Sequence, residues 1–262
     1  MNIFFNKKTI NSNLEIAERL FSTSSLNPFL AISIGSRPPE LDKAIAVLKW
    51  MLKSGSKTIP ILITDDIWLI NYIAFGYSHG KALKQVKNGK DRHMIFWEDV
   101  LRHLKPEESL RFRFVVWKEI ITPIFIEQQN LIREVFSEKT ELYNAILLLA
   151  EEFINNSGKT FTLNRCLGMA EYIIQELPAL LFGIEIDNVR YQMITYPTFL
   201  PSKMINLIAF MRVKSQFSEL LFNLSKGDLE YAKVIQMVLY EEQLVDSDEN
   251  VFKLEKTPEY SQ

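Results

Sequence analysis

Two short apolar segments, each followed by a helical pattern, constrain the fold of this chain more than any other feature. Residues 28–34 (PFLAISI) and 60–64 (PILIT) are almost wholly apolar and lack the alternation of a strand with one face in water. The segments that follow them, 40–55 and 66–76, carry apolar residues at helical spacing. Strands buried on both faces and joined through helices are typical of a parallel sheet covered on two sides. We therefore predict an α/β fold with a doubly wound, mostly parallel sheet.

The rest of the chain continues this pattern. RFRFVV at 111–116 predicts a third strand, and VRYQMITY at 189–196 alternates as a strand does. Further helices are expected at 81–104, 118–137, 139–156, 163–181 and 203–223, with Asn88-Gly89 as a candidate break in the first of them.

Charge divides the chain into two unequal parts. The 262 residues carry a net charge of −2, but the nine acidic and three basic residues from Asp228 onward account for −6. The first 227 residues are therefore at +4 and can meet an anionic partner. We expect a single domain over residues 1–227 and an acidic C-terminal extension over 228–262.

Composition argues against several classes of protein. No apolar run approaches the roughly 18 residues of a membrane-spanning helix, and the N-terminus lacks the apolar core of a secretory signal. Cys166 is the only cysteine, so no internal disulfide and no cysteine-based metal cluster are expected, and a reducing cytoplasm fits best.

Familiar catalytic motifs are absent as well. The sequence contains no GxGxxG, GxxxxGK[ST] or GxSxG segment. His79, His93 and His103 are the only histidines, they form no HExxH arrangement, and each is expected at the surface. A Ser-His-Asp triad and a zinc site are therefore poorly supported.

The turn Ser33-Ile34-Gly35-Ser36 is the first candidate site. In a parallel sheet the ligand crevice lies beyond the carboxyl ends of the strands. This turn follows the first predicted strand, and Thr64-Asp65-Asp66 follows the second, so both are expected at that edge. The alternative is a plain turn in which Ser33 or Ser36 caps the following helix.

Two tyrosines and a glutamate form a second candidate. Tyr172 and Glu176 are four residues apart in a predicted helix and share a face, where a phenol and a carboxylate could bind an ammonium group and move protons. Tyr196-Pro197 follows 20 residues later, at the end of a predicted strand. The alternatives are an ordinary Tyr–Glu pair on an exposed helix and a plain strand end.

A basic stripe lies between these segments. Within it only Asp91 is acidic, so a helix here would attract a phosphate backbone. The alternative is a solvated helix face. The basic residues are Lys81, Lys84, Lys87, Lys90 and Arg92.

Taken in this order, the segments FLAISIGS, PILITDD, the basic helix, YIIQELP and TYP resemble the cyclodipeptide synthase family over roughly residues 25–215. That family is similar to the catalytic domain of class I tyrosyl- and tryptophanyl-tRNA synthetases, which implies a Rossmann-like catalytic domain here. Its members consume two aminoacyl-tRNAs and release a cyclic dipeptide. Ser36, in place of an asparagine, together with Tyr196-Pro197, resembles the Tyr-Pro subgroup of the family.

The resemblance also implies roles for individual residues. Ser33 would be the nucleophile that carries an aminoacyl group, Tyr172 and Glu176 would hold its amino group, and Tyr196 would assist proton transfer with Glu176. The basic helix would receive the acceptor arm of the first tRNA. Lining of the aminoacyl pocket is expected from residues that could equally be plain core, namely Phe29, Ala31, Ser36, Ile61, Ile63, Leu180, Ile194 and Pro197.

Because the amino acids arrive already activated as tRNA esters, the resemblance implies no ATP, no other cofactor and no metal. A monomer in the cytoplasm is expected. Two other readings remain open: a non-catalytic tRNA- or RNA-binding module, and a small-molecule hydrolase or transferase that uses Ser33. The sequence does not identify the two amino acids.

Overall fold

The computed structural model describes residues 27–138, 141–195, 207 and 235–236. Its strands are β1 (Asn27–Ile32), β2 (Ile59–Ile63), β3 (Phe112–Val116), β4 (Ile184–Ile186), β5 (Val189–Thr195) and β6 (Ile235–Gln236). Its helices are α2 (Leu41–Leu52), α3 (Asp65–Ala74), α4 (His79–Arg102), α5 (Pro106–Ser109), the 3-10 turn η1 (Trp117–Ile120), α6 (Pro123–Ser137), α7 (Glu141–Asn156) and α8 (Leu163–Phe182).

The strands form one mostly parallel sheet, as predicted. Its order is β3-β2-β1-β5-β4, with β6 paired to β5, and of the described strands only β4 runs antiparallel to its neighbour. The central strand β1 pairs Leu30 with Ile61 of β2 on one side and with Ile194 of β5 on the other. The carboxyl ends of β1, β2 and β3 therefore meet at the same edge of the sheet.

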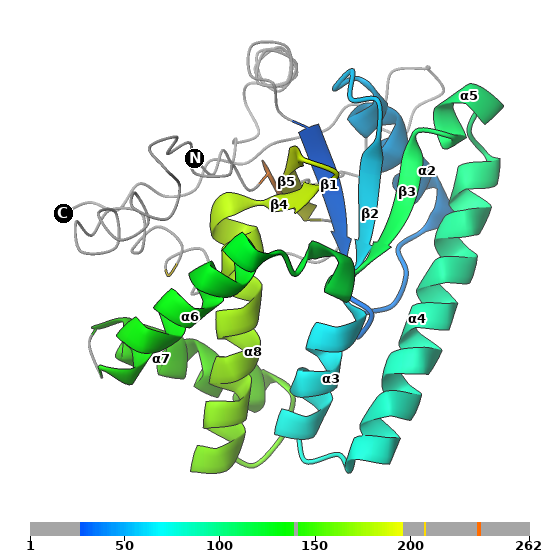
Figure 1. Ribbon diagram of the computed structural model, residues 1–262. Helices are drawn as coiled ribbons and strands as arrows, with labels where there is room; N and C mark the ends of the chain where they lie inside the picture. The colour runs from blue at the N-terminus through cyan, green and yellow to red at the C-terminus, as the bar shows by residue number, and fades with distance from the viewer. Residues whose placement is uncertain (1–26, 139–140, 196–206, 208–234, 237–262) are drawn as a thin grey trace, which may run out of the picture.

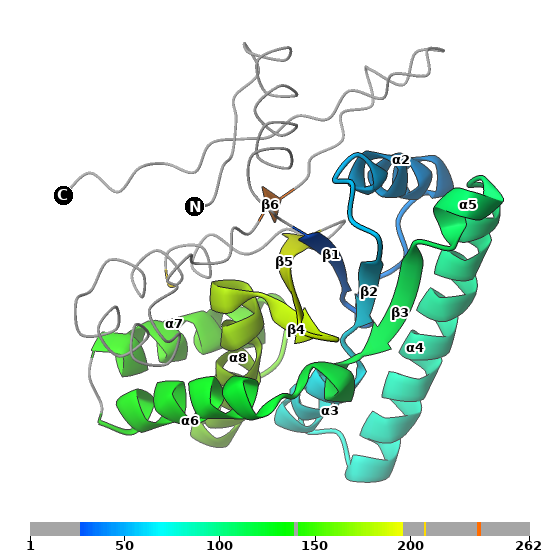
Figure 2. The same cartoon turned by 45° about the horizontal axis from the view of Figure 1, so that its top comes forward.

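Helices cover both faces of the sheet (Figures 1 and 2). Phe29 and Leu62 pack into a core with α6, α7 and α8, while Leu30 and Ile61 pack into a separate core with α2 and α4. Because successive side chains of a strand point to opposite faces, this division follows from the register of β1 and β2. Helix α3 contacts both α8 and α4 beyond the carboxyl ends of the strands.

Three local predictions need correction. The helix predicted at 118–137 is interrupted: η1 ends at Ile120, and α6 begins at Pro123 with Thr122 as its N-cap, since proline favours the first turn of a helix. The break predicted at Asn88-Gly89 is absent, because α4 runs unbroken through both residues.

The third correction concerns the strand β4, which the sequence reasoning missed. It forms a hairpin with β5 through Asp187 and Asn188, both at positive φ, as a tight two-residue turn requires. The helix predicted at 203–223 lies outside the described residues, except for Leu207. Among the described residues, no helix has the length and apolar character needed to cross a bilayer.

Candidate active site

The turn after β1 is fixed by hydrogen bonds to its own carbonyl oxygens. The backbone N–H and the hydroxyl of Ser36 both donate to the carbonyl of Ser33, at 3.2 and 2.7 Å. The backbone N–H and hydroxyl of Thr64, which follows β2, both donate to the carbonyl of Ile32, at 3.2 and 2.8 Å. Helix α2 begins only at Leu41, with Glu40 as its N-cap, so neither Ser33 nor Ser36 caps it. The half-buried Ser33 thus stands at the carboxyl edge of the sheet.

Helix α4 supplies the remaining contacts to this turn. Nη2 of Arg92 donates to the carbonyls of Ile34 (3.0 Å) and Ser36 (2.7 Å), and Nε2 of His93 lies 3.1 Å from the same Ser36 oxygen. A carbonyl oxygen can only accept, so Nε2 carries the proton. Burial lowers the pKa of His93, which favours this neutral ring.

His93 therefore corrects a prediction. It is 1% exposed rather than at the surface, because it lies one turn after Gly89 and one turn before Trp97 on the buried face of α4. His79 and His103 are exposed, as predicted.

Trp68 joins the Ser33 turn to the second candidate pair. Its ring packs so closely on Gly35 that a Cβ built on that glycine would lie 2.1 Å from the indole. The same ring makes an edge contact with Tyr172, with 6.2 Å between centroids. Sequence reasoning missed Trp68, although it stands one turn after Thr64 on the helix that leaves β2.

Tyr172 and Glu176 lie on one face of α8 and interact with each other. Burial raises the pKa of Glu176 to about 7, although the hydrogen bond from Tyr172 opposes this shift. Burial first, and then the charge of Glu176, raise the pKa of the Tyr172 phenol well above its usual value. A carboxyl group with a pKa near 7 can hold or accept a proton at neutral pH.

Asn71 of α3 is a second residue that the sequence reasoning missed. Its side chain interacts with the Tyr172 phenol and is only 5% exposed. Its Oδ1 atom is buried and has no hydrogen-bond partner among the described residues. Buried acceptors are usually paired, so this atom is available to a donor on a bound molecule.

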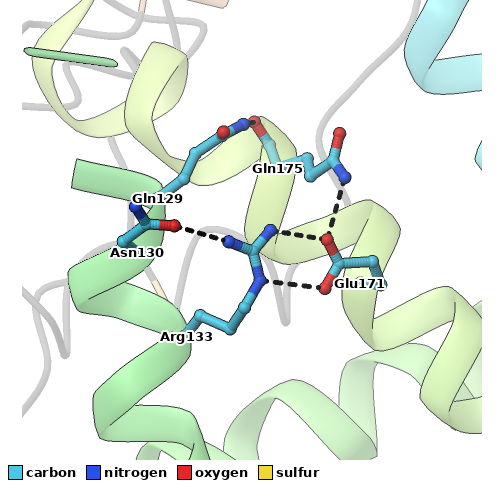
Figure 3. A network of polar contacts seen from close by, with 5 residues as sticks. All are labelled: Gln129, Asn130, Arg133, Glu171 and Gln175. Carbon is cyan, nitrogen blue, oxygen red and sulfur yellow. Dashed lines mark hydrogen bonds and ion pairs between the residues drawn. The ribbon is translucent and has the colours of Figure 1, made fainter. Parts of the chain in front are cut away.

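A polar network holds α8 against α6 beside this pair (Figure 3). Arg133 donates to both carboxylate oxygens of Glu171, at 2.6 and 3.3 Å, and to Asn130 at 3.0 Å. Gln175 donates to Glu171 at 2.8 Å, and Gln129 donates to the backbone carbonyl of Gln175 at 3.2 Å. The bidentate pair fixes the segment of α8 that carries both Tyr172 and Glu176.

The predicted pocket residues do not gather in one place. Phe29, Ala31 and Leu180 belong to the face of the sheet that α8 covers. Ile61 and Ile63 are wholly buried on the opposite face, against α2 and α4, so they cannot share a pocket with Tyr172. Ser36 is half-buried in the turn itself. The side chains of Ile194, Tyr196 and Pro197 lie outside the described part of the chain.

The predicted basic stripe also divides. Lys81, Lys84 and Lys87 are exposed on α4, and the Lys81 ammonium lies 4.6 Å from the centroid of Tyr77. Lys90 instead pairs with Asp65 at 2.7 Å, and Arg92 contacts the Ser33 turn.

Other features lie away from this edge of the sheet. A basic cavity of about 780 Å³ at the opposite edge is lined by Lys49, Leu52, Lys53, His103, Lys105, Glu108 and Arg111. The lysine and arginine side chains among them lie around the carboxyl ends of α2 and α4, where the free carbonyl groups of a helix favour positive charge. Among the described residues no group of three His, Cys, Asp or Glu side chains could hold a metal ion.

No protein-family model and no curated protein matches this sequence. Solved structures nevertheless share its fold. A cyclodipeptide synthase from Streptomyces noursei has a TM-score of 0.52 at 17% identity, with 70% of this chain and 87% of that chain covered. A cyclo(L-leucyl-L-phenylalanyl) synthase has a TM-score of 0.56 at 16% identity, with 82% of this chain and 92% of that chain covered. A CDPS (cyclodipeptide synthase) from Fluoribacter dumoffii has a TM-score of 0.56 at 16% identity, with 90% of this chain and 96% of that chain covered. At these identities the likeness establishes a common fold: the chain has the Rossmann-like architecture of the solved cyclodipeptide synthases.

Proposed function

We propose that this chain is a tRNA-dependent aminoacyltransferase that joins two aminoacyl groups into a cyclic dipeptide through an ester on Ser33. One observation carries the proposal. Trp68 packs on Gly35 of the Ser33 turn and contacts Tyr172, whose phenol is hydrogen-bonded to Glu176, so one aromatic ring links the serine turn to a carboxyl group with a pKa of about 7 through Tyr172. The shared fold with cyclodipeptide synthases supports the same reading.

In the first step, Ser33 Oγ attacks the carbonyl carbon of an aminoacyl-tRNA ester. The bond from that carbon to the ribose oxygen breaks, and the ribose oxygen takes up the serine proton. An ester is already a reactive acyl donor, so the enzyme has to supply position more than activation. The ribose oxygen thus takes the place of a histidine base, and none of the described histidines is assigned that role.

Tyr172 and Glu176 then hold the α-ammonium group of the residue on Ser33, and the buried Asn71 Oδ1 offers a further acceptor. Glu176 takes a proton from this ammonium, and the resulting amine attacks the ester carbon of a second aminoacyl-tRNA. The second tRNA leaves with a proton on its ribose oxygen, and a dipeptidyl group remains on Ser33. A pKa of about 7 lets Glu176 accept a proton and later return it.

In the last step, the free amine of the dipeptide attacks the Ser33 ester carbon and closes the ring. Ser33 leaves with a proton that Glu176 and Tyr196 help to deliver. Phe29, Ala31 and Leu180 remain the proposed lining for the first side chain, since all three belong to the sheet face that α8 covers.

The exposed lysines of α4 are proposed to receive the first tRNA. Lys81, Lys84 and Lys87 succeed one another every three residues and lie in solvent, where a phosphate backbone can reach them. Lys90 and Arg92 are already engaged with the protein, so we leave them out of the proposed tRNA surface.

One experiment tests the function as a whole. The chain is expressed in bacteria, and the medium is searched for cyclic dipeptides by mass spectrometry, with the Ser33→Ala variant as the control. We expect cyclic dipeptides with the wild type only, and their masses would identify the amino acids. A protein that binds tRNA but yields no product in culture or with purified aminoacyl-tRNAs would instead be a non-catalytic RNA-binding module.

A further inference from the structure

The backbone of the Ser33 turn is held by donors from within the turn and by donors from α4. The carbonyls of Ile32, Ser33, Ile34 and Ser36 each accept at least one hydrogen bond, and those of Ile34 and Ser36 take theirs from α4. Hydrogen bonds to several successive carbonyls restrict a loop to one arrangement, and a fixed position is what a nucleophile needs in order to meet an ester carbon.

Gly89 lets α4 come close enough to make these contacts. A Cβ built on Gly89 would lie 2.8 Å from the carbonyl oxygen of Ile34, closer than real Cβ atoms approach. Any other residue would push α4 away from the turn. The glycine thus sits in the middle of a continuous helix for a packing reason.

Arg92 suits this position because of its length and its fork of donors. One nitrogen, Nη2, carries two protons and donates to two carbonyls that lie two residues apart in the turn. A lysine side chain is one bond shorter and ends in a point charge, so it cannot replace this contact without a shift of the helix. His93 adds a donor to the second lone pair of the same Ser36 oxygen.

We propose that Arg92 and His93 are positioning residues that fix Ser33 for attack, so that α4 has two separate duties. Its first turns present the exposed lysines to tRNA, and its middle holds the nucleophile turn through Gly89, Arg92 and His93. The inference rests on the proposed function for its catalytic meaning, while the rigid turn itself can be tested without any activity.

Three measurements on Arg92→Lys separate a positioning role from a phosphate contact. The charge is kept, so tRNA affinity and its salt dependence should stay at wild-type values. The rate of aminoacyl-enzyme formation at saturating aminoacyl-tRNA should fall by about 10- to 100-fold. In hydrogen–deuterium exchange, a peptide covering residues 33–36 should exchange faster, because the bond from the Ser36 N–H to the Ser33 carbonyl loosens.

Matched variants control for a general loss of structure. Arg102→Lys makes the same change at an exposed position of the same helix and should leave all three readouts unchanged. His93→Gln places an amide N–H near the position of Nε2 and should retain more of the acylation rate than His93→Phe, which has no donor.

The outcomes are distinct. Wild-type acylation and exchange in Arg92→Lys would overturn the inference, as would a loss confined to tRNA affinity in Arg92→Ala. If the wild type formed no aminoacyl-enzyme, the proposed function would fail. The exchange experiment would then still decide the inference: faster exchange at residues 33–36 supports a held turn, and unchanged exchange overturns it.

Discussion

The Ser33 turn and the Tyr172–Glu176 pair, which Trp68 joins through Gly35 and Tyr172, have opposite kinds of surroundings. Around Ser33, polar groups of Ser36, Thr64 and α4 pair with the backbone carbonyls of the turn. Around Glu176, the burial of the carboxyl group outweighs its hydrogen bond, and its pKa rises to about 7.

This difference reflects what each group has to do. A serine that attacks an activated ester mainly needs a fixed place, which paired hydrogen bonds provide. A group that accepts and returns protons at neutral pH needs a shifted pKa, which desolvation provides at a cost in stability. The hydrogen bonds of the Ser33 turn therefore stabilise the fold, whereas the desolvation that raises the pKa of Glu176 destabilises it.

The largest expected effect is on the proton-handling side. Glu176→Gln keeps the size and burial of the side chain but removes its base, so steady-state formation of cyclic dipeptide should fall by about 10²- to 10⁴-fold. The wild-type rate should rise with pH through about 7, as Glu176 ionises. Formation of the aminoacyl-enzyme on Ser33 should be far less affected. A variant with wild-type turnover would remove Glu176 from the chemistry.

The next effect concerns the ring that joins the two sides. Gly35→Ala would place a methyl group 2.1 Å from Trp68 and displace the indole or the turn. We expect aminoacyl-enzyme formation to slow by about tenfold or more and the melting temperature to drop by several degrees, as calorimetry can show. Gly80→Ala is the control, because nothing lies within 4 Å of a Cβ at that helical position. If the two variants had the same acylation rate and the same melting temperature, the contact between Gly35 and Trp68 would have no part in the site.

A smaller effect is expected from the lysines that neither side uses. The double variant Lys84→Ala, Lys87→Ala should weaken tRNA binding by about tenfold and lower the slope of log affinity against log salt by roughly 1 to 2. The acylation rate at saturating tRNA should remain unchanged. Lys105→Ala, in the basic cavity at the opposite edge of the sheet, serves as the control. A loss of the same size with Lys105→Ala would indicate diffuse attraction instead of a defined surface.

The smallest expected effect is a gain: Glu176→Gln should raise the free energy of unfolding at high pH. The folded-state pKa of Glu176, about 7, lies above the ordinary glutamate value of 4.5, so the folded protein binds more protons between these two pH values. Stability therefore falls as pH rises through this window and levels off above it. Glu176→Gln should be more stable than the wild type by on the order of 1–3 kcal/mol at pH 8, with little difference near pH 5. Urea unfolding at both pH values measures this, and equal stability at pH 8 would argue against a buried carboxylate.

Most of the fold could be predicted from the sequence, because buried parallel strands leave a strong local pattern. The strands at β1, β2, β3 and β5 and the long helices α4 and α8 were expected within a few residues of their observed bounds. The short strand β4 was missed, although Asp187-Asn188 between Ile186 and Val189 is a turn signal of the right length.

The candidate site was harder to predict, since it depends on contacts between distant segments. Ile61 and Ile63 were grouped with Phe29, but the register that pairs Leu30 with Ile61 places them on the other face. Only the alignment of two strands decides this, and neither strand carries that information alone.

His93 and Asn71 show the same limit for polar residues. His93 is preceded in sequence by three charged residues, and its burial depends on the close approach of α4 at Gly89. A spacing of four residues from Gly89 to His93 and from His93 to Trp97 was the available signal. No sequence pattern in α3 distinguishes Asn71, because its place in the site depends on its contact with Tyr172 on α8.

The central claim is that Ser33 carries the aminoacyl group, and mass spectrometry of the intact and the digested protein tests it most directly. The purified protein is mixed with aminoacyl-tRNA, quenched in acid and digested to locate the adduct. The account predicts a mass increase of one aminoacyl group on the peptide that contains Ser33, and no increase in Ser33→Ala. An adduct that persists in Ser33→Ala, or that maps to another residue of the wild type, would contradict it.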